Sequence, residues 1–403
     1  MSDTMKTWRT PTVIILAGCL ISIVTFGTRA GFGLWLEPMS TQFGWGRETF
    51  ALSMAIQNLV WGMAQPFAGA LADRYGSARV LVGGGVLYAG GVAAMAYSTT
   101  PLTLHLSAGV LVGFSLAGAS FAIVLAAFAR TVPEERRSRA LGIATAAGSM
   151  GQFLLVPVSQ LLLDGLGWEN ALIVLSLFPL LVIPLAMALV GKSEHTGAGP
   201  EQSLAAAIRE ASRHRGYWLL VAGFFVCGFH VAFIQVHLPA HITDLGMDAS
   251  IGAWAISLIG LFNIIGAYYS GVLGGKFSKK YLLSLLYASR AVVITIYMLV
   301  PATVTTTLVF SSFMGLLWLS TIPLTSGIVA QIFGPRYMAM LFGFVFFSHQ
   351  VGAFIGVWLG GKLYDTTGSY DVVWWLAVGL AVFAALIHFP IDERSVPRLA
   401  QPA

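Results

Sequence analysis

Long apolar stretches recur along the whole chain, separated by short polar segments. Each stretch reaches roughly the 20 residues that an α-helix needs to cross a bilayer. Because backbone N–H and C=O groups in hydrocarbon must be satisfied within their own segment, we predict a helix for each stretch. Twelve spans are expected, at residues 11–39, 49–72, 79–98, 101–129, 140–163, 170–191, 217–242, 251–274, 281–300, 302–332, 338–362 and 371–390.

The two halves of this pattern repeat one another at a nearly constant offset. Arg29 and Pro38 match His230 and Pro239, each 201 residues further on. Four more pairs keep the same offset of 201: Gly142 with Gly343, Gly151 with Gly352, Asp164 with Asp365, and Gly167 with Gly368. An ordered series of this kind predicts two six-helix, pseudo-symmetric halves with a binding site between them near mid-depth.

The repeat divides the chain into three parts. We expect an N-terminal half at residues 1–191, a linker at 192–216 and a C-terminal half at 217–403. Within the polar linker, residues 202–213 form an Ala-rich amphipathic stretch that is expected to lie along the membrane surface. The fold class is therefore an all-α membrane protein.

The basic residues indicate how the spans are oriented. If the N-terminus is cytoplasmic, 18 of the 22 Lys and Arg residues fall in cytoplasmic segments, and only Arg47 and Lys362 fall outside. This asymmetry is typical of inner (plasma) membrane proteins and predicts a multi-pass protein with both termini in the cytoplasm. The remaining two arginines, Arg29 and Arg290, lie inside the first and ninth spans.

Composition supports this interpretation and excludes several functions. Hydrophobic residues make up 57% of the chain and charged residues 10%, whereas soluble domains carry about 25% charged residues. The net charge of +5 follows from the topology, so we expect no nucleic-acid partner. The two cysteines lie within spans and indicate neither a disulfide framework nor a zinc site. Because no phosphate-binding loop or nucleophile–base set is found, we expect no enzymatic activity, no cofactor and no metal.

The loop after the second span reads Gly-Ala-Leu-Ala-Asp-Arg-Tyr-Gly-Ser-Ala-Arg over residues 69–79. Its glycines permit a tight turn, and its charged side chains can bridge to a helix N-terminus or to acids and lipid phosphates. A contact of this kind can break and re-form between conformations. The candidate latch residues are Gly69, Asp73, Arg74, Gly76 and Arg79; the alternative is a solvated charged turn.

This loop resembles the signature cytoplasmic loop of the major facilitator superfamily, and the resemblance covers the whole chain. It implies the major facilitator fold and secondary transport by alternating access. Within the superfamily, the first span resembles the monocarboxylate porters and their oxalate/formate antiporter-like relatives, which tend to carry a basic residue where Arg29 stands. In the eighth span, Asn263 is followed one turn later by Ala267, where those porters often carry Arg.

A charged side chain at mid-membrane is costly, so it normally faces a cavity or a partner. All acidic residues fall in loops, termini or span ends, which leaves Arg29 without an evident counter-ion. Since a guanidinium binds carboxylate through two parallel hydrogen bonds, Arg29 predicts an anionic substrate. The alternative is a structural arginine satisfied by carbonyls, which is the interpretation that we favour for Arg290.

Further polar residues within spans are candidates for the same site. His230 and His237 share a face of the seventh span, and His230 is the repeat counterpart of Arg29, so we expect this face to be directed toward the same cavity. Both histidines are candidates for substrate contact and for proton coupling. The other candidates for substrate contact are His349, Gln350, Asn263, Gln57 and Gln152, with Asn58 as a weaker candidate and Trp61 as a residue that either lines the cavity or packs between helices. All of them are equally consistent with hydrogen bonds between helices or with neutral buried histidines.

The leading hypothesis is a secondary transporter for a small organic anion of the monocarboxylate type, coupled to protons and acting as a monomer in the lipid bilayer. One alternative is an exporter of amphipathic or aromatic compounds. A second alternative, from another class, is a sensor that binds a ligand without transporting it.

Overall fold

The structure is a computed structural model that describes residues 9–120, 123–124, 134–190, 203–334 and 337–397. The elements in these ranges are helices joined by short turns. They are α2 (Pro11–Ala30), η1 (Phe32–Trp35), α3 (Leu36–Phe43), α4 (Arg47–Tyr75), α5 (Ser77–Ala96), α6 (Pro101–Leu104), η2 (His105–Leu111), α7 (Val112–Gly118), α9 (Glu134–Ser176), η3 (Phe178–Leu181), α10 (Val182–Ala186), η4 (Met187–Leu189), α11 (Leu204–Arg213), α12 (Arg215–Asp244), α13 (Ala249–Gly274), α14 (Lys279–Leu299), α15 (Val304–Leu317), α16 (Thr321–Phe333), α17 (Met338–Thr367) and α18 (Asp371–His388).

These helices account for twelve membrane crossings. Ten segments of the described ranges are long and apolar enough to cross a membrane. One of them, Ala146–Leu189, contains two crossings, because Gly167 leaves the helical conformation (φ 75°, ψ 164°) and turns the chain within α9. The 29-residue helix α4 supplies the crossing that remains. The prediction of an all-α, twelve-helix membrane protein is confirmed.

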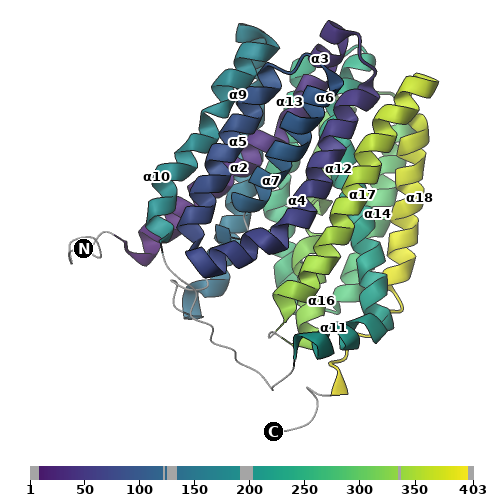
Figure 1. Cartoon of the computed structure of the whole chain (residues 1–403). Coiled ribbons are helices and arrows are strands. Elements are labelled where there is room, and N and C mark those ends of the chain that lie inside the picture. Colours follow the sequence, from purple (N-terminus) through teal and green to yellow (C-terminus); the bar gives the residue numbers. More distant parts are fainter. Residues whose placement is uncertain (1–8, 121–122, 125–133, 191–202, 335–336, 398–403) are drawn as a thin grey trace, which may run out of the picture.

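Figure 1 shows α2 to α10 on one side and α12, α14, α17 and α18 on the other, with α13 passing behind the first group. The short helix α11 lies across the foot of the second group, and α3 lies at the opposite end of the bundle. We name these two ends the α11 end and the α3 end. The α11 helix falls within the predicted amphipathic stretch and is capped by Ser203, whose Oγ accepts a hydrogen bond from the Ala206 N–H at 3.2 Å. The domain limits at 191 and 192 lie outside the described residues and stay a prediction.

The internal repeat has a structural counterpart. Gly167 and Gly368 both adopt a positive φ, 75° and 70°, where the fifth and eleventh crossings end. Gly151 and Gly352 both lie where a Cβ would collide with a backbone carbonyl, that of Ile23 in one half and that of Phe225 in the other. The matched glycines therefore mark the same turns and the same close helix contacts in each half.

Several spans that we predicted as continuous helices are interrupted in the structure. The fourth leaves the helix after α7, at Ala119, and the sixth passes through a turn at Leu177 into η3. The first and the tenth are also broken. The first stops at Ala30 and resumes through η1 and α3, whereas the tenth breaks between Leu317 and Thr321. Side chains from neighbouring helices satisfy the backbone groups that the break in the tenth span leaves free. Asn263 Oδ1 accepts a hydrogen bond from the Leu319 N–H at 2.9 Å. Arg290 Nη2 donates to the Leu317 carbonyl at 2.7 Å and to the Trp318 carbonyl. Such compensation allows irregular backbone inside a membrane protein.

Candidate functional site

Arg29 lies in the last turn of α2, just before the break at Gly31. Its Nη2 donates to Asn58 Oδ1 on α4 at 2.6 Å, and its Nη1 donates to Gln235 Oε1 on α12 at 3.3 Å. Since α2 and α4 belong to the first half and α12 to the second, the guanidinium is held between the halves. This is the location that the repeat predicts for a binding site.

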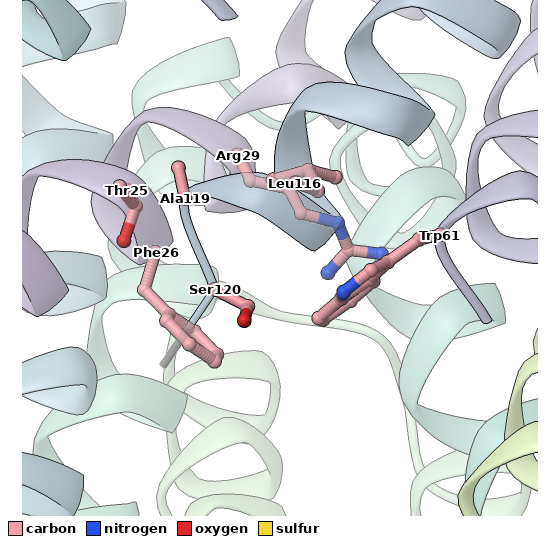
Figure 2. Close-up of a pocket in the computed structure, with 7 residues that line it drawn as sticks. All are labelled: Thr25, Phe26, Arg29, Trp61, Leu116, Ala119 and Ser120. Carbon is pink, nitrogen blue, oxygen red and sulfur yellow. The ribbon is translucent and has the colours of Figure 1, made fainter. Parts of the chain in front are cut away.

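Amide oxygens and an aromatic ring surround the charge of Arg29. Its Cζ lies 5.0 Å from the centre of the Trp61 ring, and Figure 2 shows the two groups beside one another. The ion pairs found among the described residues join Arg47 to Asp244, Lys362 to Glu48 and Arg394 to Asp392, so none of them includes Arg29. Among the described residues, the buried Nε of Arg29 finds no hydrogen-bond partner, which leaves one donor available for a further acceptor.

Two small cavities flank the guanidinium. One is lined by Thr25, Phe26, Trp61 and Ser120 among others, as Figure 2 shows. The second lies toward Met54, Gln57 and Gln235. Each has a volume of about 10 Å³, roughly the space of one water molecule. Space for a water-sized group therefore lies directly against the guanidinium on two sides.

A chain of hydrogen bonds extends from Arg29 into the second half. Asn58, which accepts from Arg29, also accepts at its backbone oxygen from Gln350 Nε2 on α17 at 3.2 Å. The Oε1 of Gln350 lies 3.0 Å from His349 Nδ1. The Phe346 ring, stacked on His349, contacts Trp61 edge-on with ring centres 5.5 Å apart. Gln350 and His349, two of the predicted candidates, thus connect to the Arg29 site.

The remaining amide candidates lie at contacts between helices. Gln57 lines the second cavity beside Arg29 and donates to the Ala108 carbonyl at 2.8 Å. Gln152 on α9 donates to the Ile256 carbonyl on α13 at 2.8 Å. Asn263 on α13 donates to Ser149 Oγ on α9 at 2.8 Å. Gln152 and Asn263 therefore connect the two halves along α9 and α13, away from the residues that line the Arg29 cavities.

The structure places His230 and His237 away from the Arg29 cavities, contrary to the expectation that their helix face is directed toward them. His230 Nε2 lies 2.8 Å from the Ala377 carbonyl on α18. His237 Nε2 lies 2.8 Å from the Val357 carbonyl, and its Nδ1 lies 3.0 Å from the Tyr370 hydroxyl. The reason is the rotation of α12 about its axis, which turns the histidines into the second half and directs Gln235 to Arg29.

At the α3 end, the two halves are joined by a cluster of charged and aromatic side chains. Arg47 on α4 binds Asp244 on α12 through two hydrogen bonds, Nη1 to Oδ2 at 2.6 Å and Nη2 to Oδ1 at 2.7 Å. The Tyr364 ring lies 3.8 Å from Arg47 Cζ. Asp365 on α17 accepts from the backbone N–H groups of Arg47 and Glu48, both at 2.8 Å. A carboxylate of the second half thus caps a helix of the first half.

The candidate latch lies at the turn between α4 and α5. Gly76 has a φ of 90°, as expected for a glycine in a tight turn. Arg74 and Arg79 are exposed, and a Cβ at Gly69 would meet none of the atoms that the structure describes within 4 Å. The side chain of Asp73 lies outside the described part of the chain, so the latch stays a prediction.

Sequence reasoning gave Asn58 and Trp61 little weight and missed Gln235. Each is a polar or aromatic residue inside an apolar span, which was the available signal. Nothing in the sequence of the seventh span distinguishes Gln235 from the histidines as the residue that meets Arg29. When most of the surface of a helix is buried, apolar residues lie on nearly all of its faces. Its own sequence then does not show which face is directed toward the binding site.

Comparisons with known families and proteins agree with the helical architecture described above. A family model described as the Major Facilitator Superfamily matches residues 18–321 and 238–402. An uncharacterized MFS-type transporter of Bacillus subtilis, YcxA, is 27% identical over 393 residues, covering 91% of this chain and 92% of that protein. Monocarboxylate transporter 13 of Bos taurus is 26% identical over 399 residues, covering 94% and 89%.

Solved structures agree in fold. A bacterial homolog to the human lysosomal transporter Spinster superposes with a TM-score of 0.77 at 14% identity, covering 98% of this chain and 100% of that one. A D-xylose-proton symporter superposes with a TM-score of 0.73 at 15% identity, covering 96% and 99%. At these identities the likeness concerns the architecture alone.

Proposed function

Because the chain belongs to the major facilitator superfamily, we propose that it transports a small organic anion, of the monocarboxylate type, across the membrane by alternating access. The observation that carries this proposal is the environment of Arg29. Its guanidinium lies between the halves and donates to two amide oxygens. Within the part of the chain that the structure describes, it meets no carboxylate, and its buried Nε has no partner. A substrate carboxylate supplies the missing negative charge through hydrogen bonds that Arg geometry favours.

Asn58 and Gln235 give Arg29 a second role in this mechanism. The hydrogen bond from Arg29 to Gln235 joins the two halves, whereas the one to Asn58 lies within the first half. A bound carboxylate competes with Gln235 for the guanidinium. Substrate binding then weakens one contact between the halves while it neutralises the charge. This exchange links occupancy of the site to the relative movement of the halves.

We further propose that transport is coupled to protons. Among the candidate histidines, His349 connects to Arg29 through Gln350 and Asn58, whereas His230 and His237 bond to carbonyls of α18 and α17. His349→Gln is expected to abolish the stimulation of uptake by an imposed proton gradient while substrate exchange persists. If His349→Gln, His230→Gln and His237→Gln all keep that stimulation, histidine-based coupling is excluded.

The proposed location is the inner membrane, with both termini cytoplasmic and a monomer as the transporting unit. The supporting observation is the uneven distribution of Lys and Arg along the chain. In this orientation the α11 end faces the cytoplasm, and the cluster around Arg47 closes the outer side.

The proposal is tested with purified protein and a series of organic acids. A monocarboxylate is expected to raise the thermal midpoint of unfolding, because a ligand that binds only the folded state stabilises it. Arg29→Gln should remove this rise and abolish uptake in liposomes. Arg29→Lys keeps the charge but cannot form both hydrogen bonds, so its KM should increase about 10- to 100-fold, equivalent to one lost charge-assisted bond of about 1.5–3 kcal/mol.

Arg394→Gln is the matched control, because this exposed arginine pairs with the neighbouring Asp392 and does not line the Arg29 cavities. Unchanged binding and uptake in Arg29→Gln would refute the anion proposal. The aromatic residues Phe26 and Trp61 beside Arg29 favour one second candidate, an exporter of aromatic or amphipathic compounds. Efflux of neutral dyes that does not depend on Arg29 would select that candidate, and saturable binding without flux would select a sensor.

A further inference from the structure

A second, larger hollow lies on the outside of the second half, between α12 and α17 and above α11. Its volume is about 430 Å³. Its walls are almost entirely apolar and include Trp218, Val221 and Phe225 from α12 and Phe344 and Val351 from α17. We name this hollow the α12–α17 groove.

The groove is separate from the Arg29 site because it uses another face of α17. Its lining residues on α17 include Phe344, Ser348 and Val351, which are spaced by four and three residues and so share one helix face. Phe346 and His349, which connect to Trp61 and Gln350, belong to a different face. Trp218 and Phe344 are 55% and 51% exposed. In a membrane-spanning chain, an exposed apolar face of this kind meets lipid.

The α11 end of the groove is closed by an amphipathic helix with a basic side. Ile208, Ala211 and Ser212 of α11 line the groove. The Trp218 Nε1–H donates to the Ser212 carbonyl at 2.8 Å, which fixes α11 against α12. On the same short segment Arg209, Arg213 and Arg215 are exposed. The groove therefore joins apolar walls to a cluster of positive charge at the level where a membrane helix begins.

We propose that the α12–α17 groove binds an anionic phospholipid, with one acyl chain in the groove and the phosphate group at Arg209, Arg213 and Arg215. Basic clusters on amphipathic helices next to membrane spans attract anionic headgroups. The apolar walls favour a ligand with an acyl chain, because a free phosphate has no apolar group to contact them. Zwitterionic phospholipids share the acyl chains but lack the net negative charge.

The experiment uses the full-length protein in detergent. Native mass spectrometry compares retention of phosphatidylglycerol with that of phosphatidylcholine carrying the same acyl chains. Each arginine near the membrane surface is expected to contribute about fivefold to the affinity for an anionic lipid. The double variant Arg209→Gln/Arg213→Gln should therefore bind phosphatidylglycerol roughly 30-fold more weakly. The matched control Lys276→Gln/Lys280→Gln removes two charges at the same end but outside the groove, and it should retain wild-type binding.

Two more variants test the position of the acyl chain. Val221→Phe and Val351→Phe narrow the groove and leave all arginines in place, so each should reduce retention of phosphatidylglycerol. Phosphatidylglycerol with brominated acyl chains should quench tryptophan fluorescence, and Trp218→Phe should remove part of that quenching. Glycerol phosphate, a headgroup without chains, should not displace the lipid.

The result expected is selective phosphatidylglycerol binding that depends on both the arginines and the groove. Equal retention of the two phospholipids would refute the proposal, as would equal losses in the arginine variant and the lysine control. Displacement by glycerol phosphate alone would assign the arginines to a free phosphate instead.

Discussion

Arg29 and Arg290 are the same residue type inside membrane spans, and their neighbours give them different uses. Arg290 is fully buried and donates to the Leu317 and Trp318 carbonyls at the break of the tenth span. Arg29 donates to two side-chain amides that belong to different halves. Carbonyls at a helix break remain in one place, whereas side-chain amides can exchange their partner for a ligand. The first environment is structural and the second is suited to binding.

Replacing Arg290 should therefore affect stability more than substrate affinity. Arg290→Met keeps a long side chain but leaves the two carbonyls without their donor, at a cost of about 1–3 kcal/mol for each unsatisfied group. We expect a lower thermal midpoint of unfolding in detergent and an unchanged KM in the fraction that stays folded. A stable Arg290→Met protein with a strongly raised KM would instead place Arg290 in the transport site.

At the scale of elements, small residues determine how closely the crossings approach. The α12 and α17 helices pack with Gly228 against the His349 carbonyl and Gly352 against the Phe225 carbonyl. The α2 and α9 helices repeat this arrangement in the other half, with Gly151 against Ile23. Without a hydrophobic driving force between helices in lipid, such close packing is a main source of association.

Gly352→Ala should destabilise the second half. A Cβ at this position collides with the backbone of Phe225, and overpacking of this kind costs about 1–3 kcal/mol. Gly343→Ala in the same helix is the control, because a Cβ there meets no atom of the described residues within 4 Å. The measurement is the thermal midpoint of each variant. Equal midpoints for the two variants would contradict the close approach of α12 and α17.

At the scale of the whole molecule, the two halves are held together at the α3 end by groups that can separate without leaving a buried charge. The Arg47–Asp244 pair is partly exposed, with 12% and 28% of the side-chain surface accessible. Asp365 caps α4 across the interface between the halves. Its repeat counterpart, Asp164, accepts a hydrogen bond from Gln160 on its own helix at 2.7 Å. The same repeated carboxylate thus joins the halves at one position and stays within one helix at the other.

Arg47→Asp should open the α3 end. The substitution replaces a bidentate ion pair by repulsion with Asp244, so the closed arrangement should lose at least about 1.4 kcal/mol, a tenfold shift in population. The measurement is the rate at which a polar maleimide labels a cysteine introduced at Met54, beside Arg29, in a chain without Cys19 and Cys227. Labelling should become about tenfold faster or more.

The double variant Arg47→Asp/Asp244→Arg restores opposite charges and should return the labelling rate toward that of the parent protein. Lys362→Gln is the control, since its ammonium lies 3.6 Å from Glu48 and is about half exposed. Labelling that stays unchanged in Arg47→Asp would show that this pair does not hold the α3 end closed.

The amino-acid sequence determined the architecture of this protein. Apolar length predicted the twelve crossings, since hydrocarbon admits few other backbone conformations, and the repeated glycines predicted the two halves. The sequence also identified Arg29, because a lone charge in an apolar span is conspicuous whatever its surroundings. The turn glycines Gly76, Gly167 and Gly368 are likewise local features, and a positive φ belongs to the residue that adopts it.

Only the tertiary structure decided which polar residues meet Arg29. The rotation of α12 depends on packing against α17 and α18, so it directs Gln235 to Arg29 and turns His230 and His237 away. The break in the tenth span also depends on tertiary contacts, because its freed backbone groups are satisfied by Asn263 and Arg290 from other helices. A helix reveals its apolar content by itself, whereas its orientation is a property of the neighbours that bury it.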